Sequence, residues 1–307
     1  MNRKIKVVAN PVAGNHALSN NWSSIGNTLK NILGDFSAEF TKGINDATTI
    51  TQRAISAGYE IIVAIGGDGT INEVVNGFFE NGCLINSETS LGIISMGTGG
   101  DWIKTWQTPE KIEETAARIR EKKIKKCDLG LLHCQGLNEN PVSRYFINIA
   151  DAGFGGCLTG LVNKSTKAFG PFFSYLLALL RTLATYENKR IQIQVEGAYD
   201  KEQIVNSVVV ANGQFFGGGM WVAPKAQIDD GLFDVIIIGD TTRREILTNI
   251  HKIYNGTLAQ HPKVKCLRGK KVKLTSNSQI LIEADGEQPG KLPATFENLP
   301  GVLNIIC

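Results

Sequence analysis

Residues 61–70 read IIVAIGGDGT, and this stretch decides how the first part of the chain folds. A run of apolar residues leads into two glycines, an aspartate, a third glycine and a threonine. β-Branched residues favour a strand, and glycines let the main chain approach a polyphosphate with unusual φ and ψ angles, so that its N–H groups point at the anion. The pattern predicts a phosphate-binding loop at the end of a buried strand.

The residues that follow the glycines add two features. Thr70, Asn72 and Glu73 open an expected helix, whose N-terminal dipole favours negative charge. Asp68 supplies a carboxylate of the kind that Mg²⁺ or its water shell takes as a ligand. The alternative is an ordinary glycine-rich turn between strand and helix, with Asp68 as an N-cap. Because the whole GGDGT sequence follows a strand, phosphate binding is favoured.

Strands and helices alternate through residues 1–127. This alternation favours a parallel sheet covered by helices, with ligands bound at the carboxyl ends of the strands. Three loops at that edge, 10–14, 66–70 and 96–101, carry polar residues and glycines. The expected strands are 5–9, 36–40, 61–65 and 91–95, and the expected helices are 22–32, 48–57, 72–79 and one that ends near Lys123.

From Cys127 onward the pattern becomes rich in strands, which predicts an antiparallel β-sandwich or a distorted barrel. Two helices are expected near 172–186 and 244–254. The expected fold class is therefore an N-terminal parallel-sheet α/β domain, 1–127, followed by an antiparallel β-sandwich-like domain, 128–307. The expected strands of the second domain are 145–150, 191–195, 205–211, 233–238, 272–275, 280–284 and 302–306.

The charge balance and the cysteines narrow the class of protein. Lys and Arg number 32 and Asp and Glu 29, and a net charge of +3 is too small to argue for nucleic acid. The basic clusters at 122–126 and 263–273 are either solvated faces or contacts for anionic lipid headgroups. Six scattered cysteines without a CxxC pair predict free thiols in a reducing cytosol.

The most apolar segment is 172–183, and it contains Ser174 and Arg181. It is shorter than the roughly 20 residues of a membrane span, so no transmembrane helix is expected. Some of its side chains could line a groove for an acyl chain or could belong to the core, and the pattern leaves both open. These are Phe172, Phe173, Tyr175, Leu176 and Leu179, with Phe215, Phe216, Met220 and Trp221.

Seven motifs together resemble the diacylglycerol kinase catalytic family, which comprises lipid kinases related to sphingosine and ceramide kinases and, more distantly, to NAD kinases. The resemblance covers nearly the whole chain. The motifs are NPVAG at 10–14, Thr41 followed by Asp46-Ala47, GGDGTINEVVNG at 66–77, Gly97-Thr98 with Asp101, NGQFFGGGM at 212–220, APKAQIDDGLFDV at 223–235, and Asp285-Gly286-Glu287.

The resemblance implies a nucleotide-binding α/β domain and a β-rich lipid domain, with ATP and the acceptor meeting in the cleft between them. Without the resemblance, Asn10-Pro11 could simply end a strand, and Thr41 and Thr98 could cap helices or turns. The residues implied to bind ATP are Asn10, Pro11, Val12, Ala13, Gly14, Thr41, Gly66, Gly67, Asp68, Gly69, Thr70, Ile71, Asn72, Glu73, Gly97 and Thr98.

The Asp285-Gly286-Glu287 segment is implied to carry the base that accepts the proton of the acceptor hydroxyl. The resemblance and the residues leave the choice between Asp285 and Glu287 open. The alternative is an Asp-Gly hairpin turn with solvated acids.

Two magnesium sites are implied. Asp68 and Asp101 would hold the Mg²⁺ that accompanies ATP and steer its γ-phosphate, so Asp68 counts among the catalytic residues. A structural ion would take the Asp230 carboxylate and the carbonyls of Gln227 and Leu232, although β-turn chemistry also explains this segment. Many relatives have asparagine before the third-loop aspartate, where this chain has Gly100, which is expected to loosen the loop.

The expected activity is transfer of the γ-phosphoryl of Mg²⁺-ATP to a lipid hydroxyl, with diacylglycerol as the leading acceptor and phosphatidic acid as the product. The alternatives are another lipid (a sphingoid base or phosphatidylglycerol), NAD, or a non-catalytic protein that binds lipid or nucleotide. The expected partners are the lipid substrate and a transient membrane surface, with no nucleic acid, and a homodimer is left open. The expected location is cytoplasmic and peripheral to the membrane.

Overall fold

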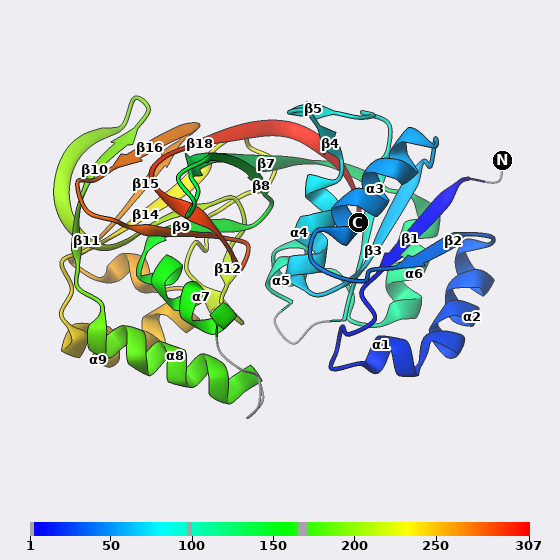
Figure 1. The fold of residues 1–307 in the computed structure, drawn as a ribbon, viewed down its shortest axis with the longest axis horizontal. Helices are drawn as coiled ribbons and strands as arrows, with labels where there is room; N and C mark the ends of the chain where they lie inside the picture. Colours follow the sequence, from blue (N-terminus) through cyan, green and yellow to red (C-terminus); the bar gives the residue numbers. More distant parts are fainter. Residues whose placement is uncertain (1–2, 97–99, 165–170) are drawn as a thin grey trace. The chain divides into compact units, whose positions relative to one another are not determined.

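The computed structural model describes residues 3–96, 100–164 and 171–307, which form two compact units. The first unit comprises Met1–Leu129, Gly217–Gly219 and Pro300–Cys307, and the second comprises Gly130–Phe216 and Met220–Leu299. Figure 1 labels the helices and strands of both units. Each unit is described by itself below.

A sheet of parallel strands forms the centre of the first unit. In spatial order its strands are the end of β18 (Glu287–Ile306), β6 (Ser90–Ser95), β3 (Ile61–Gly66), β1 (Ile5–Ala9) and β2 (Ser37–Phe40). Every neighbouring pair in this order is parallel. All six residues of β3 are buried, because helices cover both faces of a parallel sheet.

Helices surround this sheet, and a short β-hairpin follows helix α4. The helices are α1 (Ala17–Asn20), α2 (Trp22–Leu33), α3 (Asp46–Ser56), α4 (Asp68–Asn76), α5 (Asp101–Trp106) and α6 (Ile112–Glu121), and a short hairpin joins β4 (Phe79–Glu80) to β5 (Cys83–Leu84). Leu29 of α2 and Ile119 of α6 pack into one core with Val63 of β3.

The end of the chain returns to the first unit. Asn304 and Ile305 pair in parallel register with Ser90 and Leu91 of β6. The predicted division after residue 127 places residues 300–307 in the second domain, whereas their contacts place them in the first unit. The apolar pattern of 302–306 identifies a strand but carries no information on its partner.

Antiparallel strands build the second unit. The order is β15-β14-β11-β10-β16-β18, while β9 pairs with β11 and β17, and β7 pairs with β8 and β18. Their bounds are β7 (Ile124–Gln135), β8 (Pro141–Phe146), β9 (Ile149–Gly153), β10 (Lys189–Val195), β11 (Tyr199–Ala211), β14 (Phe233–Gly239), β15 (Val264–Gly269), β16 (Lys271–Thr275) and β17 (Leu281–Ala284), with a hairpin of β12 (Phe215–Phe216) and β13 (Met220–Trp221).

Three aromatic rings mark the core of the second unit. Phe146 stacks on Phe233 with ring centroids 5.7 Å apart, and its edge meets Phe296 at 6.3 Å. The unit also has helices α7 (Phe154–Lys164), α8 (Pro171–Thr185) and α9 (Arg243–Tyr254) and the 3₁₀ helix η2 (Leu258–Gln260). Among the helices that the structure describes, none combines the length and the apolar character needed to cross a bilayer.

Asp151 in β9 is a carboxylate enclosed in the second unit, at 2% exposure. Burial raises the pKa of Asp151 to about 7, although Ser207 and the N–H of Gly155 donate to the carboxylate and oppose this rise. The folded protein therefore keeps a proton that the unfolded chain releases near pH 4, so the free energy of unfolding falls as pH rises from about 4 to 7.

We expect this loss of stability to be of the order of 4 kcal/mol, measured by urea unfolding across that pH range. The variant Asp151→Asn removes the titrating group and should flatten the pH profile, whereas Asp200→Asn, at an exposed position, should leave it unchanged. A profile that is equally steep in Asp151→Asn would contradict the expectation.

Candidate functional site

Helix α4 begins at Asp68, four residues earlier than residue 72, where the sequence pattern starts it. The expectation of unusual glycine angles is wrong in this loop: Gly66 ends β3, Gly67 is extended with φ −88°, and Gly69 lies inside α4. Gly66 is needed for space instead, because a Cβ there would lie 2.6 Å from the side chain of Thr70. The GGDGT segment is therefore a direct passage from strand to helix, with its first N–H groups at a helix N-terminus.

Asn10 ties the end of β1 to this passage. Its amide Nδ2 donates to Thr70 Oγ1 at 3.0 Å, and its Oδ1 accepts from the N–H of Val12 at 3.2 Å. The Asn10 N–H donates to the carbonyl of Ile65 at 2.9 Å. Asn10 thus shapes its own loop and orients the threonine of GGDGT, a more specific role than ending a strand.

The neighbouring loops gather at the same edge. The N–H of Met96 donates to the carbonyl of Gly66, and the N–H of Thr41 donates to that of Ala9, both at 2.9 Å. Gly14 has φ +61°, and a Cβ there would lie 3.1 Å from the carbonyl oxygen of Met96. The carboxyl ends of β1, β2, β3 and β6 therefore adjoin. Thr41 is 9% exposed, Ala13 is buried, and Val12 extends into solvent at 54% exposure.

Three residues of the second half of the motif face the protein interior. The side chains of Ile71 and Asn72 are buried, so a nucleotide contact there can involve only main-chain atoms. Glu73 accepts from the N–H groups of Asn45 and Ala47 at 2.9 and 3.2 Å, and so caps the start of α3. These residues hold α4 in place and support the loop from behind.

Asp68 and Asp101 lie close together in the first unit. The Asp68 carboxylate accepts from the N–H groups of Asp101 and Trp102 at 3.4 and 3.5 Å. The Asp101 carboxylate accepts from the N–H of Gly218 at 2.7 Å and lies 3.5 Å from Lys104 Nζ. Burial raises the pKa of Asp101, while Gly218 and Lys104 lower it.

These two carboxylates suit a metal ion that binds together with a nucleotide. They do not form a complete metal site by themselves. Within the described part of the chain, no three His, Cys, Asp or Glu side chains converge to hold an ion. Magnesium commonly binds through one or two carboxylates together with substrate phosphates and water. Asp68 and Asp101 suit that mode, and phosphate oxygens would complete the ligand set.

Gly100 precedes Asp101 at the start of α5. It adopts the left-handed conformation, φ +57° and ψ +34°, and is the N-cap of α5. Glycine and asparagine are the residues that adopt this conformation with least strain. The expected loosening of the loop therefore has no counterpart at Gly100 itself. Gly97 and Thr98, which the resemblance assigns to ATP, lie outside the described residues.

The Asp285-Gly286-Glu287 segment turns between β17 and β18 in the second unit. Asp285 and Gly286 have φ +48° and +83°, and Ala284 pairs with Glu287, so this is a two-residue hairpin with both central residues left-handed. Gly286 donates its N–H to Glu283 at 2.9 Å. The alternative of an Asp-Gly hairpin turn is therefore correct for the backbone. The solvated acids that it assumed are a separate question.

Asp285 is held by main-chain donors and is not a solvated acid. Its carboxylate accepts from the N–H groups of Ile147, Asn148 and Ile149 at 2.8, 3.0 and 3.1 Å. These contacts also explain why the single strand expected at 145–150 is split into β8 and β9. Glu287 is half-buried at the first position of β18. Three main-chain N–H groups thus fix the Asp285 carboxylate in place.

The turn expected to hold a structural magnesium, with Gln227, Asp230 and Leu232 as ligands, contains an ion pair between Asp230 and Arg268. Asp230 accepts from the N–H of Leu232 at 3.1 Å and is paired through its other oxygen with Arg268. Arg268 Nε also lies 3.4 Å from Asp234. Burial raises the pKa of Asp234, and Arg268 lowers it. The Arg268 guanidinium therefore supplies positive charge to both carboxylates in this structure, and the magnesium site at this turn stays a prediction.

We expect Arg268→Gln to lower the free energy of unfolding by about 1–3 kcal/mol, because Asp230 and the buried Asp234 lose their cation. Chelation of divalent ions should leave the melting temperature of the unaltered protein unchanged. Both are measurable by thermal and urea unfolding, with Lys270→Gln, two residues further along, as the matched control. A lower melting temperature in chelator would support the predicted magnesium at this turn.

Two of these side chains were missed by the sequence analysis. Lys104 lies three residues after Asp101 on the same helix, and this spacing was available as a signal. Arg268 is 38 residues from Asp230 in sequence and 34 from Asp234, and only the pairing of β14 with β15 brings it to them. The basic cluster at 263–273 carries no such information, and the strand β15 that holds Arg268 was not among the expected strands.

Comparison with known proteins agrees with this arrangement. The family model "Diacylglycerol kinase catalytic domain" matches residues 4–132, and "YegS C-terminal NAD kinase beta sandwich-like domain" matches 148–307. A diacylglycerol kinase of Staphylococcus saprophyticus is 30% identical over 306 residues, covering 97% of this chain and 93% of that protein. One of Staphylococcus aureus is 30% identical over 312 residues, covering 100% and 93%.

A solved structure shares the fold. It is a putative diacylglycerol kinase from Bacillus anthracis, superimposable with a TM-score of 0.75 at 24% identity, over 99% of this chain and 96% of that one. The two matched models together cover an α/β catalytic region and a β-sandwich-like region, as the two units do. On the strength of the family models and of relatives aligned over nearly its full length, this chain belongs to the diacylglycerol kinase family.

Proposed function

We propose that this chain transfers the γ-phosphoryl group of Mg²⁺-ATP to the hydroxyl of diacylglycerol and so forms phosphatidic acid. The observation that carries the proposal is the junction in the first unit, where Asn10 orients Thr70 and where Asp68 lies beside Asp101. It supports nucleotide binding at the ends of β1, β3 and β6, where ligands of such sheets bind.

The first unit supplies positioning. The N–H groups at the start of α4 and the helix dipole favour the phosphate chain. Asp68 and Asp101 would hold Mg²⁺, which neutralises charge on the phosphates when bound. Lys104, beside Asp101, would keep that carboxylate ionised despite its burial. These residues orient the nucleotide and leave the proton of the acceptor to another group.

The second unit supplies the proton acceptor. Glu287 or Asp285 would take the proton from the lipid hydroxyl as its oxygen bonds to the γ-phosphorus and the bond to the β-phosphate oxygen breaks. ADP leaves with the displaced oxygen. Asp285 anchors residues 147–149 through three hydrogen bonds, and this rigid turn would place Glu287 reproducibly. The proposal requires these acids to act on an acceptor while the first unit holds the nucleotide.

An acceptor panel tests the proposal. Labelled ATP and Mg²⁺ are offered with diacylglycerol, a sphingoid base, phosphatidylglycerol or NAD, with and without anionic vesicles. Labelled phosphatidic acid is the expected product. Transfer to another lipid would revise the acceptor, and transfer to NAD alone would replace the proposal. Nucleotide binding without any transfer would identify a non-catalytic member of the family.

A further inference from the structure

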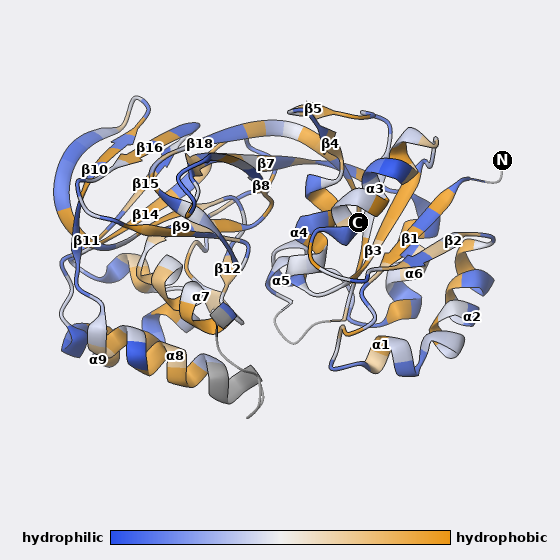
Figure 2. Ribbon diagram, viewed as in Figure 1, coloured by the Kyte–Doolittle hydropathy of each residue, from blue (hydrophilic) through white to orange (hydrophobic). Residues whose placement is uncertain are grey.

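Helix α8 in the second unit presents an apolar surface to solvent. Leu176, Leu177 and Leu180 are 37%, 70% and 53% exposed, whereas Ala178 and Leu183 are buried at 5% and 8%. A surface helix ordinarily turns its apolar side inward and its charged side outward. Here the exposed and the buried residues of 176–180 are all apolar, and Figure 2 shows the hydrophobic colour in the described part of α8.

Helix α9 extends this surface. A cavity of about 390 Å³ is lined from both helices, by Leu183 and the following Tyr186 on one side and by Arg243 and Ile246 of α9 on the other. Leu247 of α9 is exposed at 57%. Both helices run along the lower edge of the second unit in Figure 1. Leu176, Leu177, Leu180 and Leu247, with the exposed arginines of the two helices, are called the α8–α9 face below.

The charge of the α8–α9 face is positive. Its exposed arginines are Arg181, Arg243 and Arg244, and among the described residues none of the three forms an ion pair with a carboxylate. The sequence of α8 contains no Asp or Glu. Arg181 follows Leu180 on α8, and Arg243 and Arg244 lie one helical turn before Leu247 on α9, so cations accompany the exposed apolar side chains of both helices.

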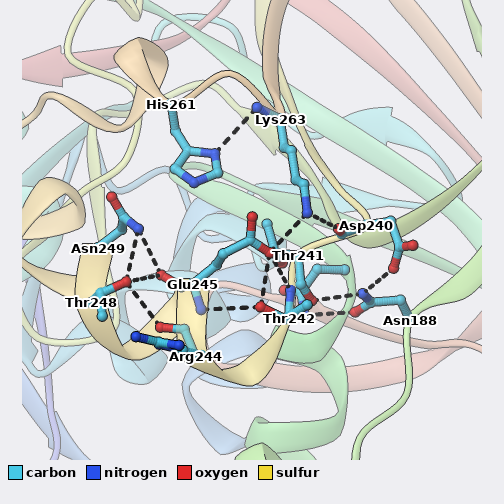
Figure 3. A network of polar contacts seen from close by, with 11 residues as sticks. Asn188, Asp240, Thr241, Thr242, Arg244, Glu245, Thr248, Asn249, His261 and Lys263 are labelled. Carbon is cyan, nitrogen blue, oxygen red and sulfur yellow. Dashed lines mark hydrogen bonds and ion pairs between the residues drawn. The ribbon is translucent and has the colours of Figure 1, made fainter.

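Glu245 is the one acid of α9, and its carboxylate is engaged in hydrogen bonds and an ion pair at the start of that helix. It completes the capping box with Thr242 and lies 2.8 Å from Lys263 Nζ, as Figure 3 shows. Lys263 also donates to the carbonyl of Asp240, and Asn188 donates to the Asp240 carboxylate. This network fixes the start of α9 and pairs Glu245, the acid of that helix, with Lys263.

We propose that the α8–α9 face is the surface by which this protein docks on an anionic bilayer. Leucines accompanied by cations match the acyl boundary and the headgroups of such a bilayer. A second copy of the chain fits less well, because a twofold contact would bring the same three arginines of each copy together. The inference rests on the proposed function to the extent that a diacylglycerol acceptor lies in a membrane.

Vesicle flotation tests the docking surface. The full chain is mixed with vesicles of phosphatidylcholine alone or with phosphatidylglycerol added, and the bound fraction is measured at low and high salt. We expect binding to the anionic vesicles that weakens with salt. The double variant Leu177→Glu/Leu180→Glu should bind at least about tenfold more weakly, because it loses buried apolar area and adds negative charge.

The matched control is Ile44→Glu/Leu137→Glu, which adds the same charge at two exposed apolar positions elsewhere, 88% and 51% exposed. It should bind as the unaltered protein does, and thermal unfolding should show both double variants folded. The proposal is overturned if the α8 variant floats normally, if the control loses binding equally, or if the unaltered protein binds neither vesicle. A change from dimer to monomer without a change in flotation would assign the surface to self-association instead.

Transfer to a short-chain diacylglycerol dispersed in detergent separates the two proposals. The α8 variant should retain this transfer and lose transfer to acceptor in vesicles. Normal docking with no transfer to any acceptor would defeat the proposed function alone. Normal transfer to vesicle-borne acceptor by the α8 variant would defeat the docking surface alone.

Discussion

Turnover is expected to fall by about 10²–10⁴-fold in Glu287→Gln or in Asp285→Asn, whichever residue is the base, with little change in the KM for ATP. A general base acts in the transition state, so its loss lowers kcat and leaves ground-state binding of the nucleotide intact. The measurement is steady-state transfer to diacylglycerol at varied ATP. Glu297→Gln, an acid on the same strand β18 that pairs with Lys271, is the matched control and should keep its kcat.

Stability distinguishes the two acids. An asparagine at 285 loses the charge that three main-chain N–H groups now share, so Asp285→Asn should unfold about 1–3 kcal/mol more easily. The free energy of unfolding of Glu287→Gln is measured in the same way. A large loss of kcat in Glu287→Gln at unchanged stability assigns the base to Glu287. Normal turnover in both variants would remove the hairpin from the mechanism.

Asp68→Asn is expected to lower kcat/KM for Mg²⁺-ATP by about 10²–10³-fold and to shift activation to higher Mg²⁺ concentration. The Asp68 carboxylate faces the N–H groups of Asp101 and Trp102, so the variant weakens both the metal-nucleotide step and the placement of α5. Initial rates measured over a matrix of ATP and Mg²⁺ concentrations separate the effect of the variant on nucleotide binding from its effect on Mg²⁺ activation. Both the nucleotide KM and kcat should change, unlike in the base variants.

Asp46→Asn is the control for this experiment. Asp46 is the first residue of α3 as Asp68 is of α4, and it accepts from the N–H of Lys42 at 2.7 Å. Its loss removes a comparable charge from a helix start in the same unit, so any general effect of that change appears in both variants. If Asp68→Asn kept the Mg²⁺ dependence and kcat/KM of the unaltered protein, the nucleotide site would be misplaced.

Local chemistry made several elements predictable. Residues 61–65 are apolar and β-branched, and they form β3 almost residue for residue. The Asp-Gly pair at 285–286 carries the signal of a two-residue hairpin, and the hairpin is there. In each case the deciding interactions lie within a few residues of one another.

The start of α4 was harder to predict. Glycines at 66, 67 and 69 suggested a loop, because glycine weakens helices. The close approach of Thr70 to Gly66, and the hydrogen bond from Asn10, give the segment a tertiary reason to enter the helix at Asp68. Packing outweighs a propensity difference of about 1 kcal/mol per residue.

The sequence by itself determined the family, the order of most strands and helices, and the segments that could bear phosphate chemistry, because these depend on periodicity and on motifs of adjacent residues. Only the tertiary structure decided that the end of the chain runs beside β6, that Arg268 pairs with Asp230, and that three distant N–H groups hold Asp285. Those outcomes join residues 38 to 214 positions apart, and local sequence carries no record of such partners.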